Sequence, residues 1–389
     1  MKSNWAFGIG PGLISGDFRG LAKLNDTGQT YSTVEMTLAN TLPLSYSRYL
    51  VAHRRGYFLT GGAVKIERSI VRVGDLDFSY LSAGEGPLVV LCHGFPQTAL
   101  CFQSQIVHLA SLGYRAVAPD LRGYGGSSKP YEVSKYSILH LTGDIISLIE
   151  ALGESKATIV GHDWGANVAW YSALFRPDVI DGVFGMSVTY RPSRPKLSPV
   201  SIFSKMGDPS QNRLFYMVYF QQEGLAEAEF DSDPEGTIRK FLYGVGSESP
   251  GDPGWNAIYT TNGRLLDQTT IPKLEPDWLN KDYVAQSVRG FKEGGFRPPL
   301  NYYRNLDKNW ELTEAFNHQK ITVPAAFLVG EKDMVRIFSR RSEEELEAGF
   351  TDLRFKRVIK GAGHWLQQEK AEEVNANLEQ FLTNLHRRR

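Results

Sequence analysis

The stretch TIVGHDWGANVAW, residues 158–170, decides the fold. It reads as an apolar strand, a tight turn between Gly161 and Gly165, and the start of a helix. A sharp strand-to-helix turn of the form Gly-x-nucleophile-x-Gly lifts the central side chain clear of the sheet. That central position is usually serine, and here it is Asp163. The stretch therefore predicts a nucleophile elbow that carries a carboxylate.

The segments around this elbow alternate between strand and helix patterns. Residues 69–84 predict an early hairpin, and the apolar run at 87–96 is typical of a strand buried on both faces. Residues 114–128 repeat this pattern as a strand and a glycine-rich loop, and residues 321–333 predict a further strand. Residues 136–153 have apolar side chains at helical spacing. This alternation predicts an α/β fold with right-handed crossovers and a mainly parallel central sheet flanked by helices.

The same pattern divides the chain into four segments. Residues 1–64 carry no interpretable motif, and we describe them as an N-terminal extension of unknown role. Residues 65–190 are expected to form the first part of the α/β core. The alternation then stops, because residues 191–318 are helical, loop-like and rich in aromatic residues and proline. It resumes over residues 319–389. We therefore predict one core with an inserted helical cap that covers the sheet edge as a lid.

Composition and charge argue against several function classes. The 43 lysines and arginines balance 43 aspartates and glutamates, so nothing favours nucleic acid or an anionic membrane as a partner. No apolar run approaches the roughly 18 residues of a spanning helix. Cys92 and Cys101 make no disulfide framework, and no residues have metal-ligand spacing. We expect a cytoplasmic monomer or homodimer that uses no cofactor and no metal.

Three candidate catalytic residues follow predicted strands in the order that a triad requires. They are Asp163 at the elbow, Asp333 in VGEKDMV and His364 in GAGHW. Each falls just after the carboxyl end of a strand, where open α/β sheets build their sites. Taken singly, they could be a helix cap, a surface turn residue and a packed histidine. Their joint order predicts a nucleophile, an orienting acid and a general base, respectively.

A carboxylate nucleophile indicates which bond is broken. Aspartate has an ordinary pKa of about 3.9, so it is ionised at neutral pH and needs no activating base. Attack on a carbonyl would give a labile anhydride, whereas attack on a saturated carbon gives a workable alkyl ester. Epoxides and carbon–halogen bonds are the natural targets. His364, oriented by Asp333, would then activate the water that hydrolyses the ester. The backbone N–H groups of Phe95 and Trp164 would hold the oxyanion.

The motifs HGFP, GHDWGA and GAGHW, with PDLRGYGGSSKP between the first two, resemble those of the soluble epoxide hydrolases of the α/β-hydrolase superfamily. The resemblance covers about residues 68–389. It implies an α/β-hydrolase fold with a cap domain, and hydrolysis of epoxides to vicinal diols without a cofactor. In this family the loop proline, here Pro96, often follows a cis peptide bond. We also expect His93, Pro96 and Trp164 to lie at the substrate pocket.

The leaving group separates epoxides from halides. An opening epoxide develops an alkoxide that needs a proton, and tyrosine hydroxyls suit that task. The segments FYMVYFQQEGLAEAEF and LNYYRNLDKNW resemble the two family segments that carry ring-opening tyrosines, and their alignment indicates Tyr216 and Tyr303. Tyr219, one helical turn away from the first, and Tyr302, adjacent to the second, remain alternatives.

Two other functions stay open. A haloalkane or haloacid dehalogenase would use the same triad, and Trp164 could donate its indole N–H to a halide. However, Phe95 stands where haloalkane dehalogenases usually offer asparagine, and fluoroacetate dehalogenases generally follow the nucleophile with arginine. A catalytically silent scaffold is disfavoured by the complete triad. We therefore predict an epoxide hydrolase whose partners are water and a small apolar epoxide.

Overall fold

The computed structural model divides the chain into two units, Met1–Arg48 and Tyr49–Arg389. It describes residues 20–24, 30–34, 64–249, 257–260, 263–269, 271, 275–279, 281–336 and 345–386. In the first unit, strands β1 (Gly20–Leu24) and β2 (Thr30–Val34) pair antiparallel. The rest of the predicted N-terminal extension, up to residue 63, lies outside the described residues. The second unit contains every predicted catalytic residue.

An eight-stranded sheet forms the centre of the second unit, in the order β12-β11-β8-β7-β5-β6-β4-β3. These strands are β3 (Glu67–Val73), β4 (Leu76–Ala83), β5 (Leu88–Cys92), β6 (Arg115–Pro119), β7 (Ala157–His162), β8 (Ile180–Met186), β11 (Ala325–Gly330) and β12 (Leu353–Ile359). β3 and β4 form an antiparallel hairpin, β4 pairs antiparallel with β6, and the other pairs are parallel. The predicted hairpin and mainly parallel sheet are confirmed.

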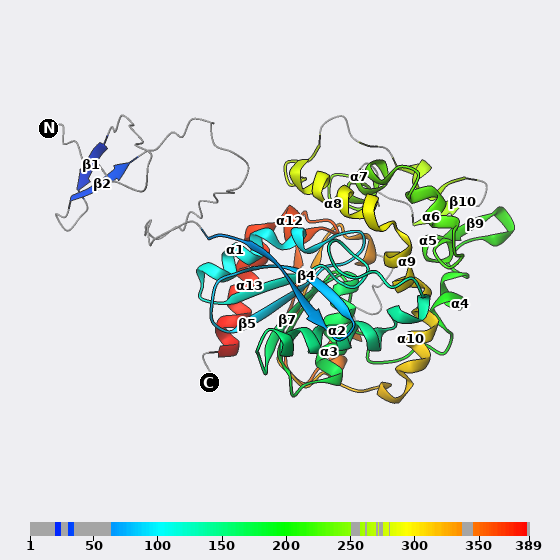
Figure 1. Ribbon diagram of the computed structural model, residues 1–389, viewed down its shortest axis with the longest axis horizontal. Coiled ribbons are helices and arrows are strands. Elements are labelled where there is room, and N and C mark those ends of the chain that lie inside the picture. The colour runs from blue at the N-terminus through cyan, green and yellow to red at the C-terminus, as the bar shows by residue number, and fades with distance from the viewer. Residues whose placement is uncertain are drawn as a thin grey trace. The chain divides into compact units, whose positions relative to one another are not determined.

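Helices cover both faces of this sheet (Figure 1). They are α1 (Gln103–Ser111), α2 (Ile138–Ala151), α3 (Trp164–Phe175), α12 (Leu366–Glu369) and α13 (Ala371–His386). α1 packs beside α13, and α2 packs beside α3. Single 3-10 turns occur at Ala99–Phe102, Val133–Tyr136, Pro209–Gln211, Leu265–Gln268, Glu314–Phe316 and Leu346–Gly349. No helix within the described part of the chain is long and apolar enough to cross a membrane.

The helix α2 shows how the sequence specifies a core-facing element. Its apolar side chains recur three and four residues apart, and Ile138, Leu141 and Ile145 are buried as that spacing predicts. The following turn contains Gly153 at φ 82°, a left-handed conformation that favours glycine. The first N–H of the helix has no side-chain cap from its own segment. Instead it donates to Asn309 Oδ1 at 2.7 Å, which links the core to the inserted segment.

The inserted segment between β8 and β11 is mostly helical and gathers at one end of the sheet (Figure 1). Its helices are α4 (Pro199–Phe203), α5 (Tyr216–Tyr219), α6 (Leu225–Phe230), α7 (Pro234–Gly244), α8 (Lys281–Gly294), α9 (Arg297–Arg304) and α10 (Leu306–Leu312). It also contains a small antiparallel pair, β9 (Arg213–Phe215) and β10 (Ile258–Thr260), which the sequence patterns did not indicate. One hydrophobic cluster extends from the sheet into these helices.

Candidate active site

Asp163 occupies the turn between β7 and α3 with φ 55° and ψ −119°. This positive φ is unusual for a residue with a side chain, and it is the strained geometry of a nucleophile elbow. The flanking glycines are required by close packing. A Cβ atom on Gly165 would overlap the backbone carbonyl of Cys92 in β5, and one on Gly161 would overlap the Gly165 carbonyl. The elbow therefore fits only because both flanking residues lack side chains.

We expect Gly165→Ala to destabilise the protein by about 1–3 kcal/mol or more, because the new methyl group overlaps backbone that cannot move aside. The matched control is Gly143→Ala, at an exposed position of α2 where a Cβ meets nothing within 4 Å. That change should stabilise by about 0.5–1 kcal/mol, because alanine favours a helix interior. Urea unfolding of both variants tests the pair. Equal stability of the two variants would contradict this account of the elbow.

The carboxylate of Asp163 lies against the backbone of the HGFP loop. Its Oδ1 accepts a hydrogen bond from the Phe95 N–H at 2.8 Å. Burial raises the pKa of Asp163, while His364 and the N–H groups of Trp164 and Phe95 oppose that rise. The backbone N–H groups of Phe95 and Trp164, the two predicted oxyanion donors, therefore both contact the Asp163 carboxylate. The peptide bond between Phe95 and Pro96 is cis.

His364 lies between the two aspartates. Its Nδ1 is 3.0 Å from Asp333 Oδ1, and its Nε2 is 3.8 Å from Asp163 Oδ2. We infer that Nδ1 carries the proton shared with Asp333, which leaves Nε2 directed towards the nucleophile. Burial lowers the pKa of His364, but the charges of Asp333 and Asp163 outweigh it and the net pKa is raised. Burial raises the pKa of Asp333, yet the contact with His364 holds it below its usual value.

Two cap tyrosines and Asp163 line the same cavity, whose volume is about 400 Å³. Tyr216 begins α5 and Tyr303 lies near the end of α9, and their ring centroids are 6.5 Å apart. Burial, with the charge of Asp163 adding to it, raises both pKa values well above 10. Both hydroxyls therefore stay protonated at neutral pH.

The two alternative tyrosines point elsewhere. The Tyr219 hydroxyl donates to Glu229 Oε2 at 2.7 Å, and the Tyr302 hydroxyl donates to the Arg122 carbonyl at 2.7 Å. Neither residue belongs to the cavity lining that contains Asp163. The structure thus brings Tyr216 and Tyr303 to the nucleophile and directs their neighbours away from it.

Comparison with known proteins places this geometry in a family. Residues 87–244 match the family described as alpha/beta hydrolase fold. The chain is 38% identical over 315 residues to Epoxide hydrolase A of Mycobacterium tuberculosis, covering 79% of this chain and 94% of the relative. It is 37% identical to Epoxide hydrolase 1 of Siraitia grosvenorii, covering 82% and 98%. The chain belongs to the epoxide hydrolases.

Solved structures agree with this assignment. An epoxide hydrolase from an endophytic Streptomyces superposes with a TM-score of 0.79 at 35% identity, covering 83% of this chain and 96% of that one. Epoxide Hydrolase A from Mycobacterium thermoresistibile superposes with a TM-score of 0.76 at 39% identity, covering 82% and 98%. The expected α/β-hydrolase fold and the family resemblance are therefore confirmed, and this epoxide hydrolase is an enzyme of the hydrolase class.

The predicted pocket residues of this epoxide hydrolase divide into two groups. Trp164 lines the cavity, with its ring 5.2 Å from that of Tyr303. His93 and Pro96 are buried and are absent from that lining. His93 instead orders the loop, because its Nε2 accepts from the Leu121 N–H at 3.0 Å. Burial lowers the pKa of His93 to about 4, so the ring stays neutral.

Three further residues support His364 or its loop and were not singled out from the sequence. Ser187 Oγ lies 3.0 Å from His364 Nδ1, on backbone with φ 70°. His162 donates from Nε2 to the His364 carbonyl at 2.7 Å, and burial lowers its pKa to about 3. Glu369 accepts from the N–H groups of Gly363 at 2.7 Å and of Trp365 at 3.0 Å. These contacts fix the histidine loop from three sides.

The cap also holds the histidine loop directly. The His364 N–H donates to the Val245 carbonyl at 3.1 Å, and the Trp365 indole N–H donates to the Leu242 carbonyl at 2.7 Å. Both acceptors belong to the end of α7, where helix carbonyls lack partners within the helix. The inserted segment is therefore part of what positions His364. Within the described residues, no group of three or more His, Cys, Asp or Glu side chains is arranged to hold a metal ion.

Proposed function

We propose that this enzyme converts epoxides to vicinal diols through a covalent ester on Asp163. One observation carries the proposal: the carboxylate of Asp163 and the rings of Tyr216 and Tyr303 line one cavity. A carboxylate supplies the nucleophile for a saturated carbon, and two protonated phenols supply hydrogen-bond donors for an oxygen leaving group. Residues 191–318 serve in this proposal as a lid, because they contain both tyrosines.

Ring opening is the first half-reaction. Asp163 Oδ1 is occupied by the Phe95 N–H, so Oδ2 is the oxygen that attacks. A bond forms between Oδ2 and one epoxide carbon while the bond from that carbon to the epoxide oxygen breaks. The developing alkoxide receives a proton from the tyrosine pair, Tyr216 and Tyr303. The product of this step is an alkyl ester of Asp163 that carries a neighbouring hydroxyl group.

Ester hydrolysis is the second half-reaction. His364 Nε2 takes a proton from water, and the hydroxide attacks Cγ of Asp163. The oxyanion forms at Oδ1, where the N–H groups of Phe95 and Trp164 stabilise it. Asp333 stabilises the imidazolium through the 3.0 Å contact to Nδ1. Breaking of the bond between Cγ and Oδ2 releases the diol, which takes its proton from His364, and the remaining proton returns to the tyrosine pair.

A dehalogenase is the second candidate, since Trp164 follows the nucleophile. The surroundings of that indole favour the epoxide. The Trp164 ring lies 5.2 Å from the Tyr303 ring, and the Trp164 side chain hydrogen-bonds to Tyr303, which only partly offsets the rise that burial causes in the pKa of this tyrosine. The Phe95 side chain packs between the rings of Phe241 and Tyr303, at 5.2 and 5.5 Å, and offers no second halide donor. A cytoplasmic location and a monomeric or homodimeric state remain predictions.

The test measures two products from one purified sample. Diol should form from styrene oxide and from a long-chain alkyl epoxide, while a bromoalkane and fluoroacetate should release no halide above the rate without enzyme. Halide release without diol formation would favour the dehalogenase. Formation of neither product would favour a catalytically silent scaffold.

A further inference from the structure

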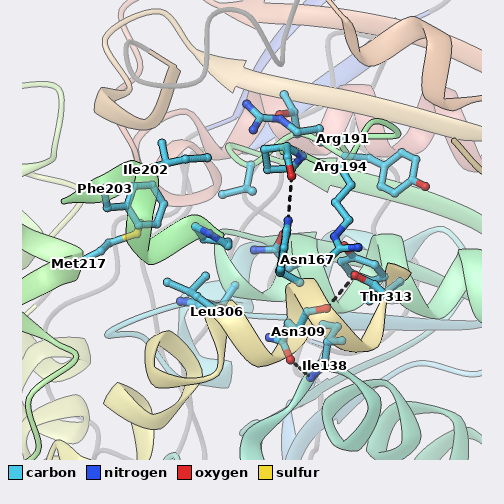
Figure 2. A pocket seen from close by; sticks show the side chains of 18 of the residues that line it. Ile138, Asn167, Arg191, Arg194, Ile202, Phe203, Met217, Leu306, Asn309 and Thr313 are labelled. Carbon is cyan, nitrogen blue, oxygen red and sulfur yellow. Dashed lines mark hydrogen bonds between the residues drawn. The ribbon is translucent and has the colours of Figure 1, made fainter. Parts of the chain in front are cut away.

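Asn167 lies in the first turn of α3, four residues after Asp163, and lines the same cavity as Asp163. In Figure 2, Asn167 lies between Phe203, Met217 and Leu306 on one side and Arg194 on the other. A primary amide therefore lines the cavity that contains the nucleophile.

The amide of Asn167 is not used by the protein in the part of the chain that the structure describes. The backbone N–H of Asn167 donates to the Asp163 carbonyl at 3.4 Å, but no described residue hydrogen-bonds to the side chain. Asn309, the neighbouring asparagine of the lining, differs because its Oδ1 accepts from the Ile138 N–H at 2.7 Å. The Asn167 amide offers two donors and one acceptor to whatever fills the cavity. Asn167 is half-buried, so water solvates this amide until a ligand displaces it, and the ligand must then replace the hydrogen bonds of that water.

Resting on the proposed function, we propose that Asn167 binds a neutral oxygen group of the substrate, an ether, hydroxyl or carbonyl, carried two or three bonds from the epoxide ring. The spacing follows from the short separation along the chain, because the attacked carbon must approach Asp163 to about 3–3.5 Å while Asn167 lies only four residues later, in the first turn of α3. The substrate class is thus an epoxide with an oxygen function beside the ring, as in a glycidyl ether. Asn167 is the residue that selects it.

A negatively charged group is a poorer fit to the same cavity. Arg194, at its other side (Figure 2), already forms a 2.9 Å ion pair with Glu314 and lies over the Trp310 ring at 3.5 Å. Arg191, the other arginine of the lining, has an interaction of its own. The neutral amide of Asn167, rather than either arginine, therefore determines which class of substrate the cavity accepts.

The test compares two substrates of equal length, phenyl glycidyl ether and the analogue in which a methylene group replaces the ether oxygen. Wild-type enzyme and Asn167→Leu are assayed on both. The ratio of kcat/KM for the ether to that for the analogue should fall about tenfold in Asn167→Leu, mostly through KM, because one hydrogen bond is lost. The inherent reactivity of each epoxide cancels in this comparison. Met217→Leu, an apolar change in the same lining, should leave the ratio unchanged.

An unchanged ratio in Asn167→Leu, or an equal loss on both substrates, would overturn the assignment, because Asn167 would then only shape the cavity. Failure of the wild type to hydrolyse either compound would count against the proposed function instead. In that case binding of the two compounds, followed by quenching of tryptophan fluorescence, still decides the role of Asn167. Tighter binding of the ether that disappears in Asn167→Leu supports it, and equal binding overturns it.

Discussion

His364→Gln is expected to open one equivalent of epoxide rapidly and then stop. Alkylation of Asp163 needs no base, so the first half-reaction should survive the substitution. Ester hydrolysis loses the group that activates water, so steady-state kcat should fall by about 10²–10⁴-fold. Glutamine keeps the side chain polar, and the loop remains held by Glu369 and by the end of α7. Rapid mixing with styrene oxide should therefore show a burst of substrate loss equal to the enzyme concentration.

Intact-protein mass spectrometry should show the trapped ester as a mass increase of one substrate molecule. His140→Gln is the matched control, since His140 is exposed on α2 and its Nδ1 contacts only Ser137 among the bonds described for it. That variant should turn over at the wild-type rate with no accumulated adduct. A His364→Gln enzyme that loses activity without any burst would contradict the assignment of alkylation to Asp163 and of ester hydrolysis to His364.

The double variant Tyr216→Phe/Tyr303→Phe should lose ring opening rather than ester hydrolysis. Removing a single donor to a developing oxyanion typically costs about 10²–10³-fold, and the loss of both should exceed the loss of either one. Phenylalanine preserves the ring packing, including the 4.9 Å contact between the rings of Tyr303 and Phe220. We therefore expect slow ring opening with no burst, no accumulated ester and a normal fold by circular dichroism.

Tyr219→Phe provides the control within the same helix. Its hydroxyl donates to Glu229 and not to the cavity, so turnover should stay within a few-fold of wild type. A double variant in which Asp163 is alkylated at the wild-type rate would contradict the proposed role of the tyrosine pair. A fall confined to the second half-reaction would do the same.

The sequence predicted the structure best at positions where the backbone geometry tolerates only a few residue types. Gly161 and Gly165 flank the nucleophile because a Cβ at either position would overlap backbone, so the elbow could be predicted from spacing alone. Burial on both faces made β5 and β7 continuous apolar runs, and both strands form as predicted. The strand-end positions of Asp333 and His364 followed from that alternation, and the structure brings them into contact.

The residues that the sequence did not reveal act through contacts between distant segments. Ser187 is an ordinary serine in a strand-end loop, and only the folded sheet places it 3.0 Å from His364. Glu369 resembles a surface carboxylate in a charged stretch, yet three N–H groups donate to it. His93 was expected at the pocket because its motif flanks the site, but its ring turns towards the Leu121 N–H. Choosing between Tyr216 and Tyr219 also needed the helix orientation, which spacing does not supply.

A single turnover in H₂¹⁸O with enzyme in excess over substrate tests the covalent ester most directly. In the proposed mechanism Asp163 Oδ2 leaves with the diol, and the oxygen of water enters the carboxylate. The first diol should therefore contain no ¹⁸O, and the peptide that carries Asp163 should gain the label. Label in the first diol with none in that peptide would mean that water attacks the epoxide directly, which would contradict the account.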